Sequence, residues 1–108
     1  MDYTQAAFQL ILHGGNARSL AMEAIQLAKS GDASGAANKL GKAAEELSLA
    51  HLAQTSLIQK EASGEKTEIS MLLIHAQDHL MNAITVKEMA AEFIELYSHI
   101  HANKGAGV

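Results

Sequence analysis

Three side chains that could take part in chemistry lie within little more than one helical turn: His75, Asp78 and His79. Residues three and four positions apart lie on the same face of a helix, so these side chains would share one surface. A metal-dependent hydrolase would need a third ligand, and none is evident elsewhere in the sequence. A nucleophilic histidine needs only a neutral imidazole, which attacks a phosphoryl group with one ring nitrogen while the other holds its proton against an acceptor.

The residues that follow His75 could orient or polarise its ring, namely Gln77, Asp78 and His79. A histidine in a helix interface is, however, commonly satisfied by a hydrogen bond without any catalytic role. Residue spacing alone favours that structural interpretation of His75 over the nucleophilic one. The sequence has no glycine-rich loop with a lysine, so we do not expect the chain to bind ATP itself.

The composition argues against several other functions. The absence of cysteine excludes disulfides, thiolate zinc sites and cysteine catalysis. The net charge of −4 and the lack of a basic patch argue against nucleic acid as the main partner. No apolar run reaches about 18 residues, so we expect no direct membrane insertion. The N-terminus lacks the basic segment of a signal peptide, and a cytoplasmic location fits this sequence.

The element that must position these side chains is a long helix over about residues 67–101, capped by Thr67 or Ser70. One apolar stripe with helical spacing is expected to face the core of the subunit: Ile69, Leu73, Ala76, Leu80, Ala83, Ala90, Ile94 and Tyr97. A second seam with heptad spacing lies opposite: Met71, Ile74, Asp78, Met81 and Thr85. Because the helix is apolar on two faces, the second face needs a partner helix, which we expect from another copy of the chain.

The remainder of the chain predicts two further helices in one domain of 108 residues. The first spans about 4–30 with Thr4 as its cap, and the second spans about 33–62 after Gly31, with Asp32 as its cap. Short turns make neighbouring helices antiparallel. Frequent alanine and the absence of proline favour long, closely packed helices. We therefore expect an all-α, antiparallel three-helix bundle that assembles into a homotrimer, with a frayed tail over 102–108.

Some residues of the helical pattern have no assigned role. Gly14 and Gly15 interrupt the first helix, and indicate either a close helix crossing or room for a partner's backbone or a phosphate. Arg18 is interpreted as a solvated or salt-bridged surface residue, and His51 as a surface or partly buried one. His99 and His101 are expected in the last turn of the third helix, where they suit its dipole.

The segment His75-Ala76-Gln77-Asp78-His79-Leu80-Met81 resembles the signature of the lactose/cellobiose-type enzyme IIA components of the bacterial phosphoenolpyruvate-dependent sugar phosphotransferase system. The resemblance extends over nearly the whole chain, with further blocks at 15–19, 28–32 and 57–62. It implies that His75 is the phosphorylated residue. It also implies a donor, the histidine-containing phosphocarrier protein, and an acceptor cysteine on the cognate enzyme IIB.

Asp78 lies in the middle of the second seam, so three copies of the chain would bring three Asp78 carboxylates near one axis. Like charges in a poorly hydrated place must be protonated or neutralised. A hard divalent cation with oxygen ligands would neutralise them, and magnesium fits best, with one Mg²⁺ per trimer. The family resemblance implies the same arrangement.

The function predicted from these residues and from the resemblance is that of a phosphoryl carrier in sugar uptake. The transported sugar would be a β-linked disaccharide of the cellobiose, chitobiose or lactose type, and the sequence does not specify which. The alternative is a non-catalytic helical oligomer that acts as an adapter or regulator through the same seam.

Overall fold

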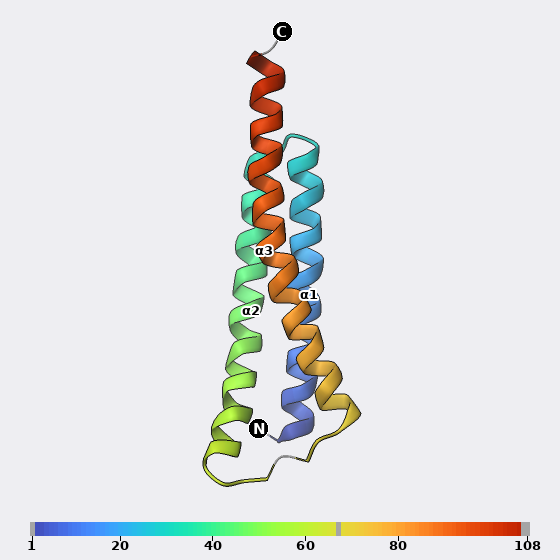
Figure 1. Ribbon diagram of the computed structural model, residues 1–108, viewed down its shortest axis with the longest axis vertical. Helices are drawn as coiled ribbons and strands as arrows, with labels where there is room; N and C mark the ends of the chain where they lie inside the picture. The colour runs from blue at the N-terminus through green and yellow to red at the C-terminus, as the bar shows by residue number, and fades with distance from the viewer. Residues whose placement is uncertain (1, 67, 107–108) are drawn as a thin grey trace.

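Three long helices form the protein: α1 (Tyr3–Lys29), α2 (Ala33–Ala62) and α3 (Met71–Ala106). The computed structural model describes residues 2–66 and 68–106, and this part of the chain contains no strand. The helices run up, down and up, so α1 and α3 are parallel and α2 is antiparallel to both (Figure 1). The molecule measures 64 × 20 × 19 Å. The predicted all-α three-helix architecture is therefore confirmed.

The first two helices begin at side-chain caps. Asp2 caps α1, because its Oδ1 accepts from the backbone N–H of Gln5 at 2.8 Å while the Gln5 side chain accepts from the Asp2 N–H. The prediction of Thr4 as the cap was wrong, since this reciprocal pair places the cap two residues earlier, at Asp2. Asp32 caps α2 as predicted, accepting from Gly35 N–H at 2.9 Å. Gly31 precedes it with φ of +94°, a conformation that glycine adopts without steric cost.

α3 starts after Ser70, one of the two predicted caps and thus the later of the two predicted starts, and it ends later than predicted. The helix begins at Met71, where Ser70 Oγ accepts from Leu73 N–H at 3.1 Å, and Thr67 lies outside the described residues. Ile69 therefore precedes the helix and is 82% exposed, so its placement in the core stripe was wrong. The helix continues to Ala106, where a frayed tail was predicted from residue 102. One glycine costs a helix only about 1 kcal/mol relative to alanine, so Gly105 does not end it.

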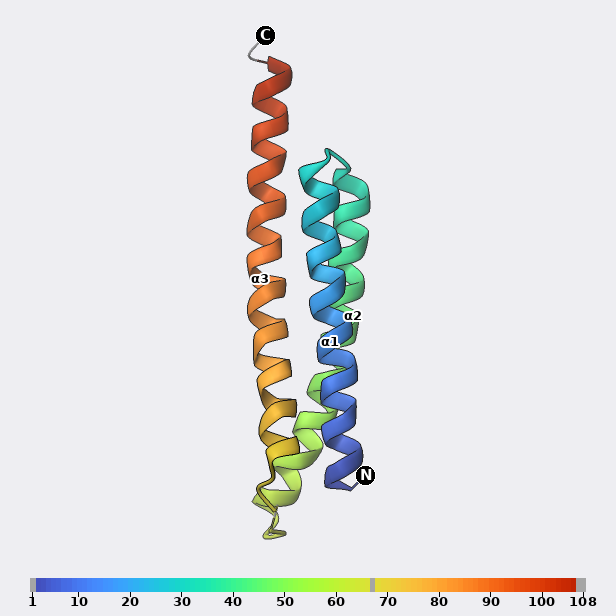
Figure 2. The same cartoon turned by 90° about the vertical axis from the view of Figure 1, so that its right-hand side faces the viewer.

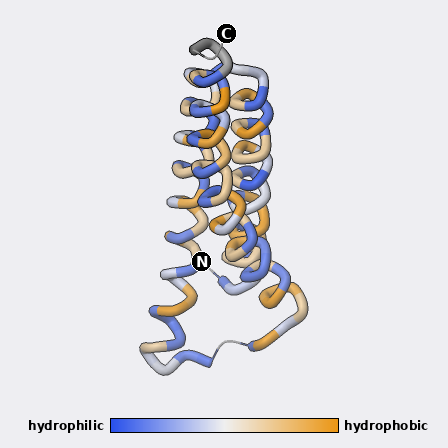
Figure 3. The backbone as a smooth tube through the Cα atoms, turned by 45° about the horizontal axis from the view of Figure 1, so that its top comes forward, coloured by the Kyte–Doolittle hydropathy of each residue, from blue (hydrophilic) through white to orange (hydrophobic). Residues whose placement is uncertain are grey.

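The core is built mainly from alanine. In α3 the predicted stripe is fully buried at Ala76, Leu80, Ala83 and Ala90. Small side chains let the helix axes approach closely, and α1 packs extensively against both of the other helices, which meet each other less. Hydrophobic and hydrophilic residues alternate along all three helices, and the tip of the connection between α2 and α3 is mostly hydrophilic (Figure 3).

Gly14 is a point of close approach between α1 and α3. A Cβ atom at this position would lie 3.3 Å from the backbone oxygen of His79 and 3.5 Å from the nitrogen of Leu80. The interpretation of Gly14 as a close helix crossing is therefore confirmed. A Cβ at the neighbouring Gly15 would meet nothing within 4 Å. The crossing fixes the position of α1 along the axis of α3, relative to the histidines of α3.

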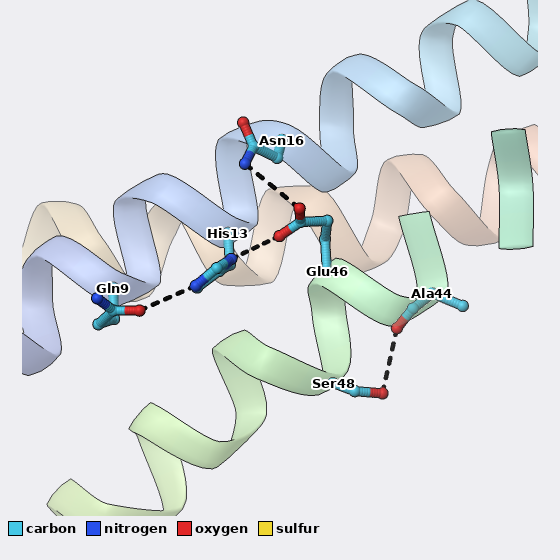
Figure 4. Close-up of polar contacts among 6 residues, drawn as sticks. All are labelled: Gln9, His13, Asn16, Ala44, Glu46 and Ser48. Carbon is cyan, nitrogen blue, oxygen red and sulfur yellow. Dashed lines mark hydrogen bonds and ion pairs between the residues drawn. The ribbon is translucent and has the colours of Figure 1, made fainter. Parts of the chain in front are cut away.

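A polar network joins α1 to α2 on the side of His13 (Figure 4). Nδ1 of His13 donates to Glu46 Oε2 at 2.5 Å, and its Nε2 lies 2.9 Å from Gln9 Oε1. Asn16 donates to the second carboxylate oxygen of Glu46 at 3.5 Å. The contacts of His13 and Asn16 with Glu46 set the register of α1 against α2, because they pair one turn of α1 with one residue of α2.

His101 joins the far end of α3 to α1. Its Nε2 lies 3.1 Å from the carbonyl oxygen of Ala28 and 3.2 Å from that of Lys29. Because a helix leaves its last carbonyls without partners, this imidazole caps the C-terminus of α1. The prediction that His99 and His101 lie in the last turn of α3 was wrong, since the helix continues past them and rises above the α1–α2 turn (Figure 2).

Candidate functional site

The three side chains singled out from the sequence line one cleft of about 370 Å³. His75, Asp78 and His79 come from the first third of α3, where helical spacing places them on adjoining parts of one surface. Asn82 and Val86 extend this lining along α3. Arg18 of α1 lines the same cleft, and sequence reasoning missed it because its place depends on the packing of two helices.

The rings of His75 and His79 are in direct contact. Their Nε2 atoms lie 3.0 Å apart, and the rings meet edge to face with centroids 4.4 Å apart. One of these nitrogens carries the N–H and donates a hydrogen bond to the other. Attack on phosphorus through Nε2 of His75 requires the contact to break, whereas attack through its Nδ1 does not. His79 is thus placed to orient the ring of His75.

Gln77 and Asp78 make other contacts. Gln77 lies toward α2, where its Oε1 accepts from Gln54 Nε2 at 3.0 Å, and it is not among the residues that line the cleft. Asp78 Oδ2 accepts from Asn82 Nδ2 at 3.3 Å. Of the three neighbours that could orient His75, His79 is therefore the one with a hydrogen bond to it.

The second seam of α3 is exposed and longer than predicted. Asp78 and Thr85 lie on it among apolar side chains, and Ile74 and Met81 are 59% and 55% exposed. The exposed apolar surface continues along the helix through Met89, Phe93, Leu96 and Ile100. We call this surface the α3 seam, running from Met71 to Ile100. A continuous apolar stripe of this length is typical of a surface that another helix covers.

A single chain does not build a metal site at Asp78 within the described residues 2–66 and 68–106, where no three His, Cys, Asp or Glu side chains gather around one point. Asp78 is one exposed carboxylate on the α3 seam.

Residues 5–98 match the family described as the lactose/cellobiose-specific IIA subunit of the PTS, the phosphotransferase system. The chain belongs to this family. The resemblance found in the sequence is thereby confirmed, as is the predicted class of enzyme. Members are phosphotransferase components that carry a phosphoryl group on histidine. Family membership favours this function over that of a non-catalytic adapter.

Individual relatives agree with the family assignment. The lichenan-specific phosphotransferase enzyme IIA component of Bacillus subtilis (strain 168) is 66% identical over 107 residues, which cover 99% of this chain and 97% of the relative. The crystal structure of the cellobiose-specific enzyme IIA of Bacillus anthracis superposes with a TM-score of 0.91 at 63% identity, covering 94% of each chain.

A third match is the IIA component in a solution structure of the IIA(chitobiose)–HPr complex of Escherichia coli. It has a TM-score of 0.80 at 37% identity, and covers 94% of this chain and 98% of that one. Within the described residues of the present IIA protein, no helix is long and apolar enough to cross a membrane.

Proposed function

We propose that the protein is a cytoplasmic phosphoryl carrier that accepts a phosphoryl group on His75 and passes it on during sugar uptake. The observation that carries this assignment is the cleft in which the His75 ring contacts His79, and which Arg18 of α1 also lines. An exposed imidazole of this kind can be reached by the active site of another protein. His79 holds the ring by a hydrogen bond at one nitrogen, which orients the other for attack.

Two displacements on phosphorus make up the transfer. The lone pair of a His75 ring nitrogen forms a new N–P bond while the N–P bond of the donor histidine breaks and its electron pair returns to that ring. In the second step the thiolate of the acceptor cysteine attacks, the S–P bond forms, and the electron pair returns to His75. Neither step needs a nucleotide, which agrees with the lack of a glycine-rich phosphate loop in the sequence.

The donor is the histidine-containing phosphocarrier protein HPr, and the acceptor is the cognate enzyme IIB. The IIA(chitobiose)–HPr complex supports the donor, because its IIA chain has the same fold over nearly all of its length. The lichenan-specific relative and the cellobiose-specific structure are the more similar proteins. They favour a β-linked disaccharide of glucose over one of the chitobiose or lactose type.

The working form is a homotrimer in which the α3 seams of three chains meet along one axis. The length of the α3 seam and its exposed apolar residues support this assembly. Full burial of an exposed side chain of this size contributes about 1.5–3 kcal/mol, and these side chains, which are about half exposed in the monomer, would each contribute roughly half of that to the trimer. Asp78 would lie near the axis, where three copies could share one Mg²⁺, an ion that prefers carboxylate oxygens.

Magnesium is expected to stabilise the trimer against thermal unfolding. At about 100 times its dissociation constant, the ion should add roughly 2.7 kcal/mol per site, and a chelator should remove this increment. Asp78→Leu should abolish the response to magnesium without unfolding the chain, since leucine suits the apolar seam. Glu45→Leu, which removes an exposed carboxylate from α2, should respond as the wild type does. Equal responses of wild type and Asp78→Leu would reject the axial metal site.

Reconstitution tests the function directly. The protein is incubated with phosphoenolpyruvate, enzyme I and HPr, and its mass is then measured. A phosphoryl carrier gains the mass of one phosphoryl group and, once separated from phosphoenolpyruvate and the donor proteins, loses it when enzyme IIB is added. An adapter gains none, and that result would overturn the proposal.

A further inference from the structure

We infer that Arg18 binds the phosphoryl group while it is attached to His75. The inference rests on the proposed function and adds a phosphate-binding residue to the same site. Arg18 is the residue with a permanent positive charge among those that line the cleft, and it comes from a different helix than His75. A guanidinium presents donors in a planar fork that matches two oxygens of a phosphoryl group.

The packing of α1 on α3 gives Arg18 its place. Gly14 brings α1 against the backbone of His79, and Arg18 lies one helical turn further along α1. Side chains of a helix lean toward its N-terminus, so that of Arg18 leans back toward the level of Gly14. Because α1 and α3 are parallel (Figure 1), that level on α3 is the turn that carries His79, next to the turn of His75.

The charge of Arg18 is not used elsewhere. Arg18 belongs to neither of the ion pairs His13–Glu46 and Lys39–Glu23, and within the described residues it makes no hydrogen bond. The one carboxylate in the cleft lining is that of Asp78, whose Oδ2 accepts from Asn82. A guanidinium without an acceptor, beside a histidine that gains a group with about two negative charges, is placed to bind that group.

Arg18 acts on the phosphoryl group without exchanging atoms or protons. The N–P bond to His75 forms as the bond to the donor nitrogen breaks, and the guanidinium keeps all of its protons throughout. Its donors stabilise the charge on the phosphoryl oxygens during both transfers. The exposed position keeps this binding weak enough for the group to leave toward the acceptor.

The test compares Arg18→Gln, Arg18→Lys and the control Lys42→Gln, which removes an equal charge from the exposed surface of α2. Each variant is phosphorylated, and the pKa of its phosphoryl group is followed by phosphorus-31 NMR. Without the cation the doubly charged form is less favoured, so Arg18→Gln should raise this pKa and slow phosphoryl transfer about tenfold. Arg18→Lys should restore the pKa but only part of the rate, and Lys42→Gln should match the wild type.

A merely structural role of Arg18 would change the unfolding transition and leave the pKa of the phosphoryl group where it is. An unchanged pKa and rate in Arg18→Gln, in a protein that is phosphorylated on His75, would overturn the inference and leave the proposed function intact. Failure of the wild type to accept a phosphoryl group would overturn the proposed function, and this inference with it.

Discussion

His75→Gln is expected to abolish phosphorylation completely. The glutamine amide has a similar reach and polarity, but its nitrogen has no lone pair available for attack on phosphorus. The variant should fold normally, because His75 is exposed and lies outside the buried core. After incubation with phosphoenolpyruvate, enzyme I and HPr, mass spectrometry should show one phosphoryl group on the wild type and none on the variant. The group should be labile in acid and stable in base.

The matched control is His51→Gln, which changes an exposed histidine of α2 in the same way. It should accept one phosphoryl group at the rate of the wild type. His79→Gln tests the orienting contact, and should slow the transfer without abolishing it, because the nucleophile remains. Normal phosphorylation of His75→Gln would place the nucleophile at another histidine.

The fold was predictable where the signals are local. The turn between α1 and α2 depends on Gly31 and on the Asp32 cap, which are neighbours in the sequence, and both were predicted correctly. The start of α1 was missed by one residue because Asp2 and Gln5 form a reciprocal pair that a single candidate cap does not reveal. The partner of His101 could not be predicted, since the end of α1 lies more than 70 positions away in the chain.

In the candidate site, too, the residues of one helix could be predicted together, whereas the contacts between helices could not. His75, Asp78 and His79 lie on one helix, so their spacing was enough to predict a shared surface. Arg18 reaches the cleft because Gly14 lets α1 approach α3, and this crossing involves two segments far apart in the sequence. Residue spacing likewise could not show that the Gln77 side chain points away from His75, because its hydrogen-bond partner is Gln54 of another helix, α2.

Ile74→Glu is expected to convert the trimer into a monomer. Ile74 is 59% exposed on the α3 seam, one turn before Asp78. Three glutamates would add like charges close to the three carboxylates of Asp78, in an interface that excludes water. Desolvation and repulsion of these groups oppose assembly, in addition to the lost burial of each isoleucine, which is worth roughly 1–2 kcal/mol for a side chain that is 59% exposed in the monomer. Light scattering should give three times 11.5 kDa for the wild type and 11.5 kDa for the variant.

Leu52→Glu provides the control, because Leu52 is 68% exposed on α2 and does not belong to the α3 seam. The same gain of charge at this position should leave the trimer intact, so the comparison separates the seam from a general effect of net charge. A wild type that is monomeric at micromolar concentration would reject the trimer. A trimer that persists in Ile74→Glu would place the contact between chains on another surface, and would leave Asp78 as an ordinary helix carboxylate.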